Sequence, residues 1–96
     1  MTEYIIYKIE QNDDPTMVYI GITNNFSVRK SNHKKNCKNK VSKKYKYPLY
    51  QYMRALGGFE KFTMSILEKN IYEDRKELLK REKELITLHN AKLNTI

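Results

Sequence analysis

Two tyrosines in two short strand-like runs are the residues of this chain best suited to chemistry. Tyr7 lies in the run 4–9, and Tyr19 lies in the run 17–22. A phenol can donate or accept a proton, and it can hydrogen-bond a phosphate. The segment 11–16 between the runs is rich in turn-forming residues, which indicates a β-hairpin that brings the two phenols close together.

Three further residues extend this pair. Arg29 and His33 are four apart on an expected helix, so their side chains share one face. A guanidinium can bind a phosphate, and an imidazole that basic neighbours keep neutral can act as a base. The plainer interpretation of His33 is a solvated helix residue. Gly21 leaves the strand face beside Tyr19 bare, which often marks a close approach by a ligand or another backbone.

One carboxylate stands on a helix face that should be buried. Glu82 is flanked at helical spacing by an apolar stripe of Leu78, Leu79, Leu85 and Ile86. Burying an isolated charge costs several kcal/mol unless it is paired or binds a metal. Glu82 is therefore either a metal ligand or catalytic acid at the rim of the core, or a structural glutamate that pairs with an arginine or reaches out at the edge of the stripe.

Zinc is the weaker interpretation of the histidines. His33 and Cys37 are four apart and His89 is a third candidate ligand, but a structural zinc site takes four ligands and no fourth Cys or His exists. Cys37 is the only cysteine, which excludes an internal disulfide. We therefore expect a reducing, intracellular setting, either cytoplasmic or nuclear.

The excess positive charge is confined to one segment. The net charge is +8, and residues 29–46 contain nine Lys or Arg and no acid, whereas the charges elsewhere nearly cancel. A concentrated basic segment is typical of a protein that binds a nucleic-acid backbone. Four tyrosines near it suit stacking on unpaired bases, namely Tyr45, Tyr47, Tyr50 and Tyr52, although Tyr52 is rather expected to pack in the core or to line the site. The lysines expected to bind nucleic acid are Lys30, Lys34, Lys35, Lys38, Lys40, Lys43, Lys44 and Lys46.

A sheet and helices must position these residues. Strands are expected over 4–9, 17–22 and 61–67, helices over 25–36, 48–56 and 72–89, a basic loop over 37–47 and a packed or frayed tail over 91–96. In the third strand, Phe62, Met64 and Ile66 alternate with polar residues and predict one buried face. The order β-β-α-α-β-α predicts an α+β fold, with a small, three-stranded, mainly antiparallel sheet and flanking helices.

Chain length sets further bounds. Ninety-six residues make a single domain, 1–96, with room for one site. No run approaches the ~18 apolar residues of a membrane span, and no signal peptide is visible, so no membrane partner is expected. A longer native chain with a further DNA-binding domain is compatible with this length, and the oligomeric state is open.

Together these residues resemble a GIY-YIG nuclease domain. Ile5-Ile6-Tyr7 stands where the family has Gly-Ile-Tyr, and Tyr19-Ile20-Gly21 matches the second half of the family name. The segment 49–54, followed by Gly57 and Phe62, is similar to homing-endonuclease-like members. Arg29 and His33 match the arginine and the histidine on the family's first helix. Glu82 matches its metal-binding glutamate, and Asn94 resembles the asparagine near the end of the family domain. The resemblance covers essentially the whole chain.

This resemblance implies hydrolysis of phosphodiester bonds in DNA with Mg²⁺ or Mn²⁺. In the implied mechanism, Glu82 holds one metal ion and Arg29 stabilises the transition state. Tyr7 is the favoured general base, and His33 is the competing one. A free phenol has a pKa near ~10, so Tyr7 needs nearby cations to work at neutral pH.

Supporting roles follow from the same resemblance. Tyr19 hydrogen-bonds the phosphate or supports the first tyrosine, Gly21 belongs to the motif, and Asn94 orders the end of the domain near the site. The departure from the motif is Ile5 in place of the family's first glycine. Isoleucine fits a strand better than glycine, and its presence leaves the catalytic set complete.

Two other functions stay open at this point. A non-catalytic module that binds DNA or RNA through residues 29–46 predicts a damaged catalytic set, whereas every expected position is filled here. A basic scaffold protein in which Glu82 and Arg29 form a structural ion pair predicts no response to divalent metal. The residues do not distinguish homing, repair and restriction roles, and they do not indicate a DNA target.

Overall fold

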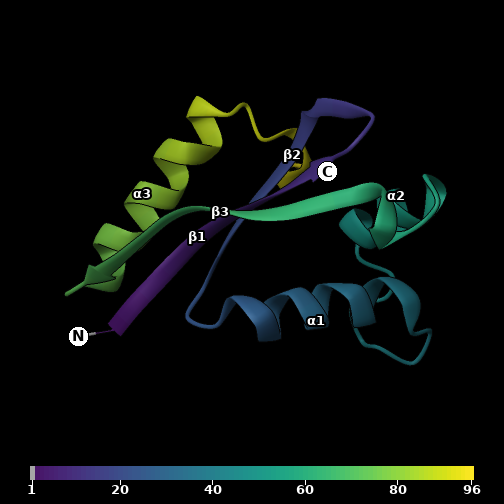
Figure 1. The fold of residues 1–96 in the computed structure, drawn as a ribbon, viewed down its shortest axis with the longest axis horizontal. Helices are drawn as coiled ribbons and strands as arrows, with labels where there is room; N and C mark the ends of the chain where they lie inside the picture. Colours follow the sequence, from purple (N-terminus) through teal and green to yellow (C-terminus); the bar gives the residue numbers. More distant parts are fainter. Residues whose placement is uncertain (1) are drawn as a thin grey trace.

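A three-stranded antiparallel sheet forms the centre of the computed structural model, which describes residues 2–96 (Figure 1). The strands lie in the order β2-β1-β3, so β1 is central and the other two are edges. Both strand pairs are antiparallel, which confirms the predicted α+β fold. The strands are β1 (Thr2–Gln11), β2 (Asp14–Thr23) and β3 (Phe62–Tyr72).

The first two strands form the predicted hairpin. Tyr7 lies opposite Gly21, and Tyr19 lies opposite Ile9. Both strands are longer than predicted because polar residues at their ends also pair. Since alternate residues point to the same face, the side chains of Tyr7 and Tyr19 share one face of the sheet, where both belong to one hydrophobic cluster.

The helices are α1 (Phe26–Lys38), α2 (Pro48–Ala55) and α3 (Arg75–Leu88), with two 3₁₀ turns, η1 (Phe59–Lys61) and η2 (Lys92–Asn94). The sequence leaves the N-cap of α1 open between Asn24 and Asn25, and the structure shows Asn25, whose Oδ1 accepts a hydrogen bond from the Val28 N–H at 3.2 Å. After α2, Gly57 and Gly58 adopt φ values of 114° and 109°, which other residues rarely tolerate, and the helix ends there. No helix within residues 2–96 is long and apolar enough to span a membrane.

The predicted start of the last helix was wrong. Tyr72 is the final residue of β3, and α3 begins at Arg75. Asp74 is the N-cap, since its carboxylate accepts a hydrogen bond from the Lys76 N–H at 2.9 Å. The strand therefore runs up to the cap, and the third strand is longer than the predicted 61–67.

Two expected core residues are exposed. Ile66 pairs with Tyr7 in the same alternation as Phe62 and Met64 but is 47% exposed, and it lies directly before a bulge where β3 carries one extra residue, Leu67, opposite β1. Leu79 is 43% exposed, so the buried stripe of α3 is narrower than predicted.

The sheet has a hydrophobic core on each face. Figure 1 shows α1 and α2 on one side of the sheet and α3 on the other. Tyr7 and Ile9 pack with Cys37 of α1 and Met53 of α2 on the first face. On the second face, strand residues pack against the buried leucines of α3, and the cluster is Ile6, Val18, Ile20, Leu78, Leu85 and Ala91. Residues from α1 and α3 can therefore meet only around an edge of the sheet.

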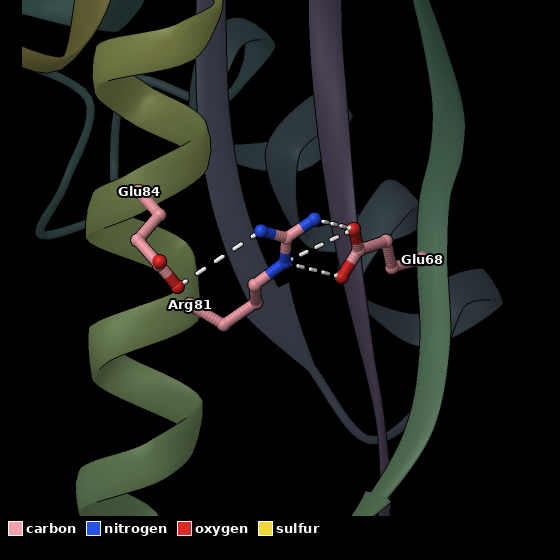
Figure 2. A network of polar contacts seen from close by, with 3 residues as sticks. All are labelled: Glu68, Arg81 and Glu84. Atoms are coloured by element: carbon pink, nitrogen blue, oxygen red, sulfur yellow. Dashed lines mark hydrogen bonds and ion pairs between the residues drawn. The ribbon is translucent and has the colours of Figure 1, made fainter.

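An ion-pair network joins α3 to β3 (Figure 2). Arg81 Nε donates to both carboxylate oxygens of Glu68 at 2.9 and 3.1 Å, and Arg81 Nη2 also binds this carboxylate. Arg81 Nη1 lies 3.9 Å from Glu84 Oε1. Successive helix residues are rotated by about 100°, so this contact toward β3 turns the neighbouring Glu82 away from β3. The network thus adds a polar contact to the rotation of α3 that its buried residues Leu78 and Leu85 set.

Candidate active site

A buried chain of hydrogen bonds links β1 to the two helices on the same face. Tyr7 Oη lies 2.7 Å from His33 Nε2, and His33 Nδ1 lies 2.9 Å from Tyr50 Oη. Asn36 Nδ2 donates to the Tyr50 oxygen at 3.4 Å, and Ser42 Oγ donates to Asn36 Oδ1 at 2.6 Å. Both nitrogens of the imidazole therefore have a partner, and the ring is held in one orientation.

His33 is buried, with 4% of its surface exposed, so its interpretation as a solvated helix residue was wrong. Burial, followed by the charges of Arg29 and Lys44, lowers the pKa of His33 to about 4. The imidazole is therefore neutral near pH 7, with one nitrogen that donates and one that accepts. A phosphate bound by the same two cations would offset their charge and make the imidazole more basic.

Tyr7 packs directly against Gly21 on the neighbouring strand. The Tyr7 side chain is 1% exposed, and a Cβ atom at position 21 would lie 2.6 Å from Tyr7 Cζ. The close approach that the sequence predicted at Gly21 is thus made by a side chain rather than by a ligand or a backbone. Burial and the neighbouring Tyr19 raise the pKa of Tyr7 above its usual range, so this phenol is protonated.

Gly21→Ala is expected to destabilise the protein by about 1–3 kcal/mol, as over-packed cores do, and to slow any reaction that depends on Tyr7. An ordinary Gly→Ala change acts in the opposite direction and stabilises by about 0.4–1 kcal/mol. Urea unfolding of the two proteins measures the difference. A variant as stable as the wild type would show that the Tyr7 ring has room to move and is not fixed by Gly21.

Tyr19, Arg29 and His33 line one cleft of about 230 Å³ at the free edge of β2. The Tyr19 ring centroid lies 5.9 Å from that of His33 and 6.5 Å from that of Tyr7. Arg29 Nη2 donates to the Ile22 carbonyl at 3.3 Å, which holds the guanidinium at this edge. Burial raises the pKa of Tyr19, so its hydroxyl keeps its proton. The cleft thus presents a phenol donor, an imidazole and a guanidinium together.

Asn94 closes the same cleft from η2. Its Oδ1 accepts a hydrogen bond from the Ile20 N–H, and its Nδ2 donates to the Ile20 carbonyl, both at 2.7 Å. The side chain therefore satisfies the backbone of the edge strand β2 where no further strand pairs with it. Leu93 beside it is 2% exposed, so this part of the tail packs back onto the domain.

Glu82 lies on the buried side of α3, between Leu78 and Leu85 along the stripe, and is partly exposed. It does not line the cleft with Arg29. Within residues 2–96 Glu82 forms no ion pair, so the interpretation as a structural Glu82–Arg29 pair was wrong. The structure thus brings Tyr7, Tyr19, Arg29 and His33 together, whereas Glu82 comes from α3, the helix on the other side of the sheet, and stays outside the cleft lining.

Burial and one nearby cation act on the carboxylate of Glu82. Burial raises the pKa of Glu82, and the nearby charge of Arg75 opposes this shift. The Glu82 charge in turn raises the pKa of both Tyr7 and Tyr19, so its field extends to the tyrosine pair. In the described part of the chain no three His, Cys, Asp or Glu side chains gather, which leaves no zinc cluster. A single carboxylate with water as further ligands fits Mg²⁺.

The basic segment continues outward from the cleft. Lys44 lines the cleft itself. Lys34 and Lys38 line a separate hollow between α1 and the segment 54–60. The eight lysines predicted to bind nucleic acid are all exposed, namely Lys30, Lys34, Lys35, Lys38, Lys40, Lys43, Lys44 and Lys46. Lys38 Nζ lies 3.9 Å from Glu60 Oε1, and the other seven lysines form no ion pair within residues 2–96, so their charges can meet an extended anion that passes over α1 and the following loop.

The tyrosines around this segment have different surroundings. Tyr45 lies beneath the Arg54 guanidinium at 3.6 Å, and Tyr50 is buried against His33. Tyr52 Oη donates a hydrogen bond to Gln11 Oε1 at 2.6 Å, and the Tyr52 ring packs against the first hydrophobic cluster, as expected for a packed residue. The exposed side chain on the rim of the cleft belongs to Tyr47.

The prediction that Tyr50 stacks on unpaired bases was wrong, because Tyr50 is 5% exposed, and the roles of Asn36 and Arg75 were missed by reasoning from sequence alone. Tyr50 and Asn36 complete the hydrogen-bonded chain of His33, and Arg75 lies close to Arg29 and Glu82. Asn36 follows His33 by three positions on the helix, a spacing that indicates a shared face. No comparable local signal marks Tyr50, which comes from a different helix.

Comparison with known families agrees with this geometry. The family model of the GIY-YIG catalytic domain matches residues 3–94, a range that contains Tyr7 and the cleft residues from Tyr19 to Asn94. No curated protein and no solved structure matches the chain significantly. Because the family match spans nearly the whole chain, and the domain is a nuclease domain, this chain belongs to the GIY-YIG family of nucleases.

Proposed function

We propose that this protein is a metal-dependent DNA endonuclease that hydrolyses phosphodiester bonds at the cleft beside β2. The proposal is carried by the 2.7 Å contact between Tyr7 Oη and His33 Nε2, next to a cleft that Arg29 lines. A phenol and a neutral imidazole in contact can transfer a proton, and a guanidinium beside them suits a phosphate.

The general base is the pair of Tyr7 and His33 acting as one unit. An attacking water gives its proton to Tyr7 Oη while Tyr7 passes its own proton to His33 Nε2, so no free phenolate forms. This path avoids deprotonating a phenol whose pKa is raised by burial. It uses the tautomer in which His33 Nδ1 donates to Tyr50 Oη. Direct action of His33, which lines the cleft, is the alternative.

Arg29 and Tyr19 act on the phosphate. The extra negative charge of the transition state develops on phosphate oxygens, and the Arg29 guanidinium at the cleft edge stabilises it. Tyr19 donates its hydroxyl hydrogen to a phosphate oxygen, since its raised pKa keeps it protonated. Asn94 binds the backbone of β2 at Ile20 and so holds the neighbouring Tyr19 in place at the cleft.

Glu82 would hold one Mg²⁺ or Mn²⁺ ion, with water completing the ligands. When bound, the ion supplies Lewis-acid stabilisation of the phosphate charge and of the leaving 3′ oxygen. Glu82 must be ionised to bind, so the burial that raises its pKa makes metal binding weaken as the pH falls.

DNA is the proposed substrate, and the exposed lysines of residues 29–46 bind its backbone. The test incubates supercoiled plasmid with the wild-type protein in Mg²⁺, in Mn²⁺ and in EDTA. We expect nicked plasmid with either metal and none in EDTA. Plasmid that is retarded on a gel but never nicked would instead favour a non-catalytic binding module.

Arg29→Ala is expected to slow cleavage by about 10²- to 10³-fold, the loss that follows removal of one donor to a developing oxyanion. Lys30→Ala is the matched control, since it removes an exposed cation one residue further along α1. Single-turnover rates on plasmid measure both, and melting temperatures show whether the lost bond to Ile22 affects folding. Equal losses in the two variants would reduce Arg29 to a general DNA contact.

A further inference from the structure

A second pocket adjoins the active-site cleft at the C-terminal end of β2. Its volume is about 230 Å³, and it is lined by Tyr4, Ile22, Thr23, Asn24, Arg29 and Arg75. Arg29 lines both this pocket and the cleft, so the two hollows are neighbours that share this residue. The lining includes two arginines and no acidic side chain.

Arg75 has one acidic neighbour, Glu82, whose burial-raised pKa it lowers, but Glu82 does not line the pocket and forms no ion pair with Arg75 within residues 2–96. Arg75 is the first residue of α3, where the helix dipole favours acids and disfavours cations. Its side chain is exposed, and within residues 2–96 it forms no ion pair. Arg81 on the same helix shows the contrast, because it is bound to Glu68 and Glu84.

Two like charges that line one pocket repel each other unless an anion lies between them. A guanidinium presents paired N–H donors that match the oxygens of a phosphate. Asn24 and Thr23 on the same wall add neutral hydrogen-bond donors. The pocket thus has the charge and the donors of a phosphate site.

We propose that this pocket binds the DNA backbone phosphate next to the scissile one, through Arg75. The inference rests on the proposed function, because it places the scissile phosphate in the adjoining cleft. A DNA strand that passes from the cleft over Arg29 carries its next phosphate into the pocket on the other side of that guanidinium. Arg75 is therefore a substrate-binding residue that aligns the strand and does not touch the reacting atoms.

The test compares Arg75→Ala with Lys76→Ala, which removes the next exposed cation of α3. Binding of a short DNA duplex is measured by fluorescence anisotropy in EDTA at several KCl concentrations. Arg75→Ala is expected to weaken binding about tenfold and to reduce the slope of log K against log salt by about 0.9. Lys76→Ala should change both far less, and equal changes in the two variants would overturn the proposal.

Neutral methylphosphonates, placed in turn along one strand of the duplex, locate the phosphate. A methylphosphonate next to the cleavage site should weaken DNA binding by the wild type. The same methylphosphonate should not weaken binding by Arg75→Ala any further, because the contact is already lost in this variant. Identical profiles for the two proteins would overturn the proposal. A second outcome would also overturn it: inorganic phosphate raises the melting temperature of the wild type, but Arg75→Ala binds DNA as tightly as the wild type does. The pocket would then bind the free ion and not the DNA backbone.

Failure of the proposed function is distinguishable from failure of this inference. A wild-type protein that binds DNA but never nicks it contradicts the nuclease, whereas the anisotropy comparison still decides on Arg75. Removing a cation from a helix N-terminus should leave the melting temperature equal to or above that of the wild type. If Arg75→Ala melts lower, Arg75→Gln replaces it in the same comparison.

Discussion

Replacing Tyr7 by phenylalanine is expected to slow DNA cleavage by about 10²- to 10⁴-fold, the range that positioned general acid–base groups contribute. Phenylalanine keeps the ring that packs against Gly21 but removes the oxygen that lies 2.7 Å from His33 Nε2. Water then has no acceptor with a path to the imidazole. Single-turnover nicking of plasmid at saturating Mg²⁺ measures the effect, and the melting temperature reports whether the fold is intact.

His33→Gln is the matched variant for this experiment. If Tyr7 and His33 act as one unit, the two single variants and the double variant should lose similar amounts of activity, because removal of either member breaks the relay. Losses that multiply in the double variant would indicate separate roles. Full activity of Tyr7→Phe would move the base to His33, or to hydroxide from bulk water if His33→Gln is active as well.

Glu82→Gln is expected to lower metal-dependent cleavage by about 10³-fold or more, since a bound ion supplies several kcal/mol of transition-state stabilisation. Glutamine matches the shape of glutamate but lacks the charge that attracts Mg²⁺. Glu77→Gln is the control, because Glu77 is an exposed acid on the same helix and, within residues 2–96, it has no ion pair. Plasmid nicking over a Mg²⁺ titration separates weaker metal binding from slower chemistry.

The stability of the same variant provides a second measurement. Burial raises the pKa of Glu82 above 4.5, so ionisation of this side chain costs folding stability once the pH exceeds that value. The stability advantage of Glu82→Gln over the wild type should therefore grow as the pH rises from 4.5 and level off above the folded pKa. Adding Mg²⁺ should raise the melting temperature of the wild type only. Equal shifts in both proteins would contradict metal binding at Glu82.

Local sequence signals were sufficient for most of the fold. Asn25 at the start of α1 and Pro48 at the start of α2 mark helix starts through their own chemistry, and the hairpin follows from alternation around a turn. The errors arose where a neighbouring strand or a cap decides the outcome. Ile66 lies beside a bulge in β3 and is exposed, and the cap at Asp74 lets the strand continue through Tyr72.

The members of the site were predictable as residues, but their contacts were not. Tyr7 and His33 are 26 positions apart, and helical spacing cannot show that the face with His33 packs onto β1. Tyr50 completes the site from a second helix, so no periodic pattern connects it to His33. Arg75 was missed because a cation at an exposed helix start is usually solvated, and its pocket exists only once α1 and α3 meet at β2.

Parallel nicking of supercoiled plasmid by the wild type and by Glu82→Gln, with millimolar Mg²⁺ and with EDTA, tests the proposed active site most directly. We expect open-circular product from the wild type in Mg²⁺, and none from either protein in EDTA or from Glu82→Gln in Mg²⁺. Equal nicking by the two proteins, or nicking that persists in EDTA, would contradict a metal-dependent nuclease centred on Glu82.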